Sequence, residues 1–192
     1  MTIRPRFILC FTLMAALARP VAAAPDLTGL RDTTVLIIRH AEKPESGPDL
    51  TPAGEKRARD YVNYFKNFSI DSKPVKPDYL VATADSRNSH RPRLTLTPLS
   101  QAMRLPLHLG FKDKKYAELA TELKSAPHGK NILICWHHGA IPELLGALGA
   151  DPDKLIPGGK WPEAQFGWLI ELRYDHAGRL MPDESKRIEI KL

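Results

Sequence analysis

Three short runs of β-forming apolar residues constrain most strongly what this chain can fold into. They lie at residues 33–39 (TTVLIIR), 78–84 (DYLVATA) and 131–136 (NILICW). Each run is nearly continuous in hydrophobicity rather than alternating, which is typical of strands that are covered on both faces. The sequence therefore predicts a central, mostly parallel sheet with a layer of helices on each side.

Segments with helical periodicity separate and follow these runs. Residues 50–68 start with Thr51 as an N-cap and Pro52 at the first helical position, and apolar residues then recur on one face. Residues 113–125 and 140–150 show the same kind of pattern. Strands and helices that alternate in this way predict an α/β fold, a three-layer α/β/α sandwich.

The C-terminal part of the chain has a different pattern. Apolar and polar residues alternate in residues 166–180 and 186–192, and a turn sequence lies at residues 175–178. This predicts a hairpin that adds antiparallel strands to the sheet. Two segments rich in Pro and Gly, at residues 43–49 and 157–163, are predicted to be loops and are candidates to line the mouth of a pocket.

The N-terminal segment has the make-up of a secretory signal peptide. A basic start (MTIRPR) is followed by an apolar run (FILCFTLMAALA) and by small residues that suit cleavage after Ala23. A membrane anchor is the alternative, but the run is short for a bilayer span, and Arg19 and Pro20 interrupt it. We therefore expect removal of residues 1–23, a single domain over residues 24–192, and a periplasmic or secreted protein without stable membrane insertion.

Charge and cysteine content narrow the choice of partners. The full chain has a formal net charge of +6, and three arginines and no acid would leave with the signal peptide. The weak remaining charge, without a basic run interleaved with aromatic residues, does not indicate a nucleic-acid partner. Cys135 would be the one cysteine left, and its apolar surroundings predict a buried packing role.

Basic and imidazole side chains follow each of the three predicted strands. Arg39 and His40 come directly after the first, the sequence DSRNSHRPR follows the second, and His137 and His138 follow the third. Ligands of open α/β sheets bind at the carboxyl ends of the strands, so we expect these groups to meet at one edge. Cations gather in a cleft when an anion lies among them, and the planar fork of arginine suits a phosphate.

An imidazole beside arginines can also act as a nucleophile. Neighbouring cations disfavour its protonation, so it can attack phosphorus and form a phosphohistidine that water later hydrolyses. This scheme needs no metal and no other cofactor. A metal half-site is the alternative use of the His137–His138 pair, but the Cys or spaced His ligands that zinc prefers do not accompany it.

Taken together, these segments resemble the histidine phosphatase superfamily, the phosphoglycerate-mutase-like or RHG group. RHAEKP (39–44) is similar to its first motif, with Ala41 where glycine often stands. LTPAGEKRA (50–58), RPRLTLTPLS (91–100) and ILICWHHGAIPELLGALG (132–149) are similar to three further segments, in family order. Four short motifs in the same order rarely coincide by accident.

The resemblance implies roles for five residues. His40 would be the phosphorylated nucleophile, and Arg39 and Arg91 would clamp the phosphate. The remaining phosphate ligand would be His138, which precedes a glycine as in the HG form of the motif, or His137, which is selected by counting back from the following Ile-Pro. The segment before Arg91 is longer than is usual in the family.

A proton donor, an acid in many members, is not fixed by any motif here. Glu118 lies where some members keep it, although it also fits the solvated side of an ordinary helix. Without a well-placed acid, leaving groups of low pKa would be favoured. The resemblance thus implies a metal-independent phosphatase for a small phosphomonoester, and the N-terminal segment predicts that it is exported. The alternatives are a phosphoglycerate-mutase-type phosphotransferase and a non-catalytic module that binds phosphorylated ligands.

Overall fold

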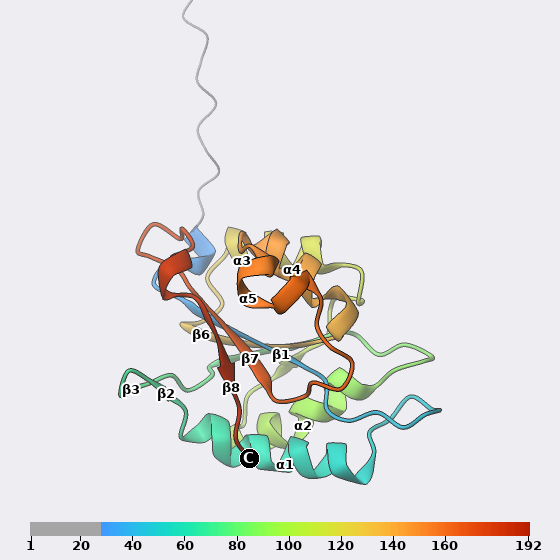
Figure 1. The fold of residues 1–192 in the computed structure, drawn as a ribbon. Helices are drawn as coiled ribbons and strands as arrows, with labels where there is room; N and C mark the ends of the chain where they lie inside the picture. The colour runs from blue at the N-terminus through green and yellow to red at the C-terminus, as the bar shows by residue number, and fades with distance from the viewer. Residues whose placement is uncertain (1–27) are drawn as a thin grey trace, which may run out of the picture.

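A six-stranded sheet forms the centre of the computed structural model, which describes residues 28–192 (Figure 1). The strand order is β5-β4-β6-β1-β7-β8. The predicted signal peptide and its cleavage site lie outside the described residues. The strands of the sheet are β1 (Thr34–Arg39), β4 (Tyr79–Ala82), β5 (Leu107–His108), β6 (Asn131–Trp136), β7 (Trp168–Arg173) and β8 (Lys186–Glu189), and a separate small hairpin consists of β2 (Ser69–Ile70) and β3 (Lys73–Pro74).

The pairing of the strands confirms the predicted mixed sheet. Strands β1, β4, β5 and β6 run parallel, β7 is antiparallel to β1, and β8 is antiparallel to β7. A turn at the predicted position follows β7, where the N–H of Gly178 donates to the carbonyl oxygen of Asp175 at 2.9 Å. Gly178 has a φ of 74°, a conformation that glycine adopts without steric cost.

Helices cover both faces of the sheet. The first face carries α1 (Pro52–Lys66) and α2 (Arg91–Met103), and the second carries α3 (Tyr116–Ser125), α4 (Ile141–Leu148) and the short α5 (Pro152–Leu155) (Figure 1). The fold is therefore the three-layer α/β/α sandwich that the sequence predicts. In the described part of the chain, no helix has the length and apolar content that a bilayer crossing needs.

Strand β1 is buried on both faces, as its continuous apolar run predicts. Val35 and Ile37 belong to the core beneath α3 and α4, whereas Leu36 and Ile38 belong to the core beneath α1 and α2. Because side chains of a strand alternate between its two faces, only a strand between two apolar layers needs four aliphatic residues in a row. The two cores hold the carboxyl end of β1 firmly at the sheet edge.

Helix α1 begins as the sequence predicts. The hydroxyl of Thr51 accepts a hydrogen bond from the N–H of Gly54 at 3.1 Å, and Pro52 occupies the first turn. A Cβ atom at Gly54 would lie only 2.6 Å from the carbonyl oxygen of Glu42. The glycine therefore allows the first turn of α1 to lie against the chain that leaves β1.

Helix α2 is the main element that the sequence patterns do not predict. Two prolines interrupt its sequence pattern, and a proline inside a helix removes a backbone hydrogen-bond donor. Pro92 lies in the first turn, where no donor is needed, but Pro98 lies in the interior. The buried residues Leu96 and Leu99 hold the helix on the sheet despite that missing hydrogen bond.

Candidate active site

The candidate site lies at the carboxyl ends of β1 and β6, which are neighbours in the sheet. Arg39 and Trp136 are paired in register, and the backbone N–H of His40 donates to the carbonyl oxygen of Trp136 at 3.0 Å. The ring of His40 lies 5.3 Å from that of His137 and 6.3 Å from that of His138, measured between ring centroids. The three imidazoles therefore meet at one edge of the sheet.

His40 lies at the floor of the site, with 2% of its surface exposed. Its Nδ1 atom is 2.7 Å from the carbonyl oxygen of Ala41. A carbonyl oxygen only accepts hydrogen bonds, so Nδ1 carries the proton and Nε2 keeps a free lone pair. Burial, reinforced by the charges of Arg39 and Arg91, lowers the pKa of His40 to about 3. The ring is thus neutral and nucleophilic at ordinary pH.

Arg39 is completely buried. It links the site to the loop between η3 (Pro157–Gly159) and β7, which we call the C-terminal loop. Its Nη1 atom donates to the carbonyl oxygens of Pro162, Glu163 and Gln165 at 3.2, 2.5 and 3.1 Å, and its guanidinium carbon lies 3.9 Å from the ring centre of Phe166. Burial lowers the pKa of Arg39 to about 10, so it stays charged. This arginine therefore fixes the loop that the sequence predicts as a pocket rim.

Arg91 is the first residue of α2. Its Nη1 atom donates to the carbonyl oxygen of Gly47 at 3.0 Å, in the other predicted loop. The hydroxyl of Thr95, one turn further along α2, accepts from the N–H of Ala41 at 2.9 Å and donates to the carbonyl oxygen of Arg91 at 2.8 Å. Thr95 thus joins the end of β1 to the start of α2.

Both arginines keep an unused donor. The Nε atoms of Arg39 and Arg91 are buried and have no hydrogen-bond partner among the described residues. In Arg39, Nε and Nη2 lie along the same edge of the guanidinium, opposite the Nη1 atom that holds the loop, and such an edge matches two oxygens of a phosphate. A buried donor without a partner costs about 1–3 kcal/mol. The two Nε atoms therefore fit a tetrahedral anion.

His137 and His138 follow β6 directly, at the start of a single 3-10 turn, η2 (His138–Ala140). Burial lowers the pKa of His137 to about 4, and the charges of Arg91 and Arg39 add to the effect. The pKa of His138 is also lowered, first by burial and then by Arg39, whose Nη2 atom lies 3.3 Å from its Nδ1 atom. Because Arg39 can only donate, His138 accepts at Nδ1 and carries its proton on Nε2.

Other charged residues of the motifs are engaged away from Arg39, Arg91 and the three histidines. Glu42 accepts two hydrogen bonds from Nε of Arg57, at 2.9 and 3.1 Å, so it supports the loop after β1 rather than the chemistry. Glu118 lies on the exposed side of α3 and pairs with Lys115. No described contact connects Glu118 with His40 or its neighbours. The structure therefore does not bring this predicted proton donor to the site.

The sequence patterns do not assign a role to two further residues of the site. Phe166 stacks on Arg39, and the carboxylate of Glu163 lies 4.0 Å from Nε2 of His138. Both come from the C-terminal loop, more than 120 positions after Arg39. Glu163 falls in the Pro- and Gly-rich segment that the sequence predicts as a candidate rim, whereas Phe166 falls at the start of the predicted hairpin and has no sequence signal for this contact. Trp161 of the same loop is buried against Trp168 and offers no exposed stacking surface.

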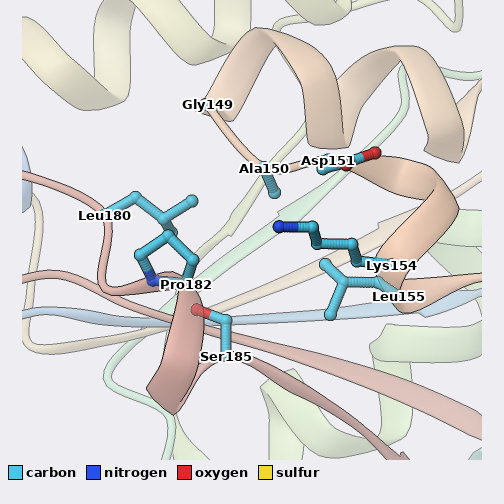
Figure 2. A pocket seen from close by; sticks show the side chains of 8 residues that line it. All are labelled: Gly149, Ala150, Asp151, Lys154, Leu155, Leu180, Pro182 and Ser185. Carbon is cyan, nitrogen blue, oxygen red and sulfur yellow. The ribbon is translucent and has the colours of Figure 1, made fainter.

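A separate pocket lies at the far end of α4 (Figure 2). It is bounded by the end of α4, by α5 and by the chain around η4 (Pro182–Glu184), and the side chain of Lys154 extends across it. None of its lining residues belongs to the candidate active site described above. Within residues 28–192, no group of three or more His, Cys, Asp or Glu side chains is arranged to hold a metal ion.

Comparisons with known proteins agree with this architecture. No protein-family model and no curated protein matches the sequence. SixA from Agrobacterium tumefaciens, provisionally named as a phosphohistidine phosphatase, aligns with a TM-score of 0.53 and 18% sequence identity. The alignment covers 78% of this chain and 96% of the SixA chain. Phosphoglycerate mutase from Plasmodium falciparum aligns with a TM-score of 0.51 and 14% identity over 78% of this chain and 87% of its own. These likenesses establish the fold.

Proposed function

Because the chain has the fold of the histidine phosphatase superfamily, we propose that it is a phosphatase that hydrolyses a small phosphomonoester through a phosphohistidine intermediate. The observation that carries the proposal is the pair of buried, unpartnered Nε donors of Arg39 and Arg91 beside a neutral His40. Paired donors suit the oxygens of a phosphate, and a neutral imidazole suits attack on its phosphorus.

The geometry supports a two-step reaction. In the first step, Nε2 of His40 attacks phosphorus, a P–N bond forms and the P–O bond to the leaving alcohol breaks. In the second step, water attacks phosphorus, the P–N bond breaks and inorganic phosphate leaves. Arg39 and Arg91 hold the non-bridging oxygens, with His138 as the predicted further ligand, and charge stabilisation of this kind supplies most of the catalysis in phosphoryl transfer.

Two other functions fit the same fold. A non-catalytic module would bind phosphorylated ligands without turnover, but a buried neutral histidine with a free Nε2 atom favours an enzyme. A phosphoglycerate-mutase-type phosphotransferase would pass the phosphoryl group to a second alcohol instead of water. Added sugar or glycerate acceptors that capture the phosphoryl group would support that alternative.

Turnover of p-nitrophenyl phosphate by the full-length protein tests the proposal. We expect release of inorganic phosphate and, after rapid quenching with a ³²P-labelled substrate, an acid-labile label on His40. His40→Ala should abolish both, and His176→Ala, which changes an exposed histidine of the Asp175 turn, should retain both. Equal rates for the protein and His40→Ala, or the absence of a labelled histidine during turnover, would contradict the proposal.

We further propose that the phosphatase acts outside the cytoplasm. The support is the basic, apolar and small-residue order of the N-terminal segment, which lies outside the described residues. Fractionation of cells that make the full chain should place the protein in the periplasm or the medium, with a new N-terminus at Ala24. Recovery of the uncleaved chain from the cytoplasm would contradict this expectation.

A further inference from the structure

One acidic residue, Glu163, is anchored at the proposed phosphate site by its backbone. The carbonyl oxygen of Glu163 accepts from Nη1 of Arg39 at 2.5 Å, while its side chain extends to 4.0 Å from Nε2 of His138. The side chain is 79% exposed. Glu163 therefore combines a fixed main chain with a carboxyl group that is free to move at the mouth of the site.

The charge interactions of Glu163 connect it with two residues of the site. Glu163 is the carboxylate with the strongest charge interaction with Arg39, and it is also the one that interacts with His138. Four other acids of the surrounding loops and of α3 are engaged with basic partners, namely Glu42 with Arg57, Asp49 with His90, Asp85 with Arg93, and Glu118 with Lys115.

The direction of the reaction places the leaving group near this carboxylate. In-line transfer requires the attacking and leaving atoms to lie on opposite sides of phosphorus. His40 lies at the floor, almost fully buried, so the leaving oxygen must depart toward the mouth. An alkoxide leaving group needs a proton there, and the exposed carboxyl group of Glu163, 4.0 Å from Nε2 of His138, is placed to supply one.

We propose that Glu163 is the proton donor for the leaving group, an inference that rests on the proposed phosphatase function. In the first step, the carboxyl proton passes to the leaving oxygen as the P–O bond breaks, which yields a neutral alcohol and a carboxylate. In the second step, this carboxylate takes a proton from the attacking water as the P–N bond breaks. Inorganic phosphate leaves, and His40 and Glu163 return to their starting states.

Substrates with different leaving groups test this role. Phenyl phosphate and β-glycerol phosphate release strongly basic oxygens, whereas p-nitrophenolate needs little protonation. Glu163→Gln should lower kcat/KM about 100-fold for β-glycerol phosphate and only a few-fold for p-nitrophenyl phosphate. With p-nitrophenyl phosphate, the second step should become rate-limiting, so a burst of nitrophenol should precede a slow steady state. Glu122→Gln, an exposed acid of α3, is the matched control and should leave both substrates unaffected.

The possible outcomes separate three explanations. An equal loss for all substrates in Glu163→Gln would overturn the donor role and assign Glu163 to the positioning of His138. No loss at all would overturn it as well, and a selective loss in Glu118→Gln would transfer the role to that residue. Partial recovery by Glu163→Asp for β-glycerol phosphate would support it. If the unaltered protein hydrolyses none of the substrates, the proposed function itself fails, which is a result distinct from all of these.

Discussion

His40 donates its Nδ1 proton to the carbonyl oxygen of Ala41 across 2.7 Å. This bond selects one tautomer and leaves Nε2 without a proton, so the residue next in sequence prepares His40 for its proposed role as nucleophile. Because the donor and acceptor belong to adjacent residues, the bond depends on the local turn of the chain after β1. Thr95 holds this turn, and Arg39 and His138 belong to the proposed phosphate site beside it.

The stability of the ligand-free protein should fall as the pH decreases from 6.5 toward 3. Burial holds the pKa of His40 at about 3, while the unfolded chain binds a proton near pH 6.5. The unfolded state therefore binds more protons in this window, which removes up to about 1.4 kcal/mol per pH unit for this group. Thermal unfolding in phosphate-free buffer should show a shallower fall for His40→Asn. His176→Asn should keep the original slope, and a parallel fall in His40→Asn would contradict the assignment.

Replacement of the two adjacent histidines should have unequal effects. We predict that His138 is the phosphate ligand, so His138→Ala should lower kcat/KM more than His137→Ala does. The loss for a ligand of the transition-state charge is about 100-fold or more. Steady-state kinetics with p-nitrophenyl phosphate measures both. A larger loss in His137→Ala would reverse the assignment, since that ring lies closer to His40.

Thr95→Val should reduce both stability and turnover. The substitution keeps the shape of the side chain but removes the acceptor for the N–H of Ala41 and the donor to the carbonyl oxygen of Arg91. A buried backbone donor left without a partner costs about 1–3 kcal/mol. Chemical denaturation and kcat/KM should both reveal the loss.

Thr97→Val is a matched control for that experiment. Its hydroxyl makes the same kind of bond along α2, to the carbonyl oxygen of Arg93 at 2.8 Å, and has no described bond to the end of β1. Turnover in Thr97→Val should therefore match the unaltered protein. If both variants lose activity equally, the effect lies in α2 as a helix and not in the link from Thr95 to Ala41.

Arg39→Lys should lower kcat/KM by at least about 100-fold although the charge is kept. Lysine lacks the planar fork, so it cannot hold three carbonyl oxygens with one end and two phosphate oxygens with the other. Arg187→Lys provides the comparison, because Arg187 also stacks on an aromatic ring, that of Trp168 at 4.4 Å, away from the site. Similar kinetics for Arg39→Lys and the unaltered protein would show that charge alone suffices.

The apolar runs and the residues that follow them were enough to predict the sheet, its layers and the meeting of Arg39 and His40 with the later histidines. This part of the site was predictable because parallel strands bring their carboxyl ends to one edge. Helix α2 was not predictable in the same way, since Pro98 interrupts its pattern. The hydrogen bonds from Arg39 to the C-terminal loop could not be predicted either, because their acceptors are backbone carbonyl groups, which every residue possesses.

Glu163 shows a further reason why part of the site escapes sequence analysis. Its position depends on a loop without regular periodicity and on a partner 124 positions earlier in the chain. The family resemblance offers Glu118 as a candidate instead, which lies between motifs but on the exposed side of α3. Proximity in sequence is a poor guide to proximity in space when the loop that closes a site comes last.

The bonds from Arg39 to the C-terminal loop also bear on how a growing chain acquires activity. His40, the proposed nucleophile, and both arginines are synthesised within the first half of the protein, but Nη1 of Arg39 has its partners 123 to 126 residues further along. Until that loop is made, the guanidinium of Arg39 lacks these three acceptors, and its edge toward the proposed phosphate site is not oriented. We therefore expect a chain that ends before the loop to carry every motif residue and yet to lack the proposed activity.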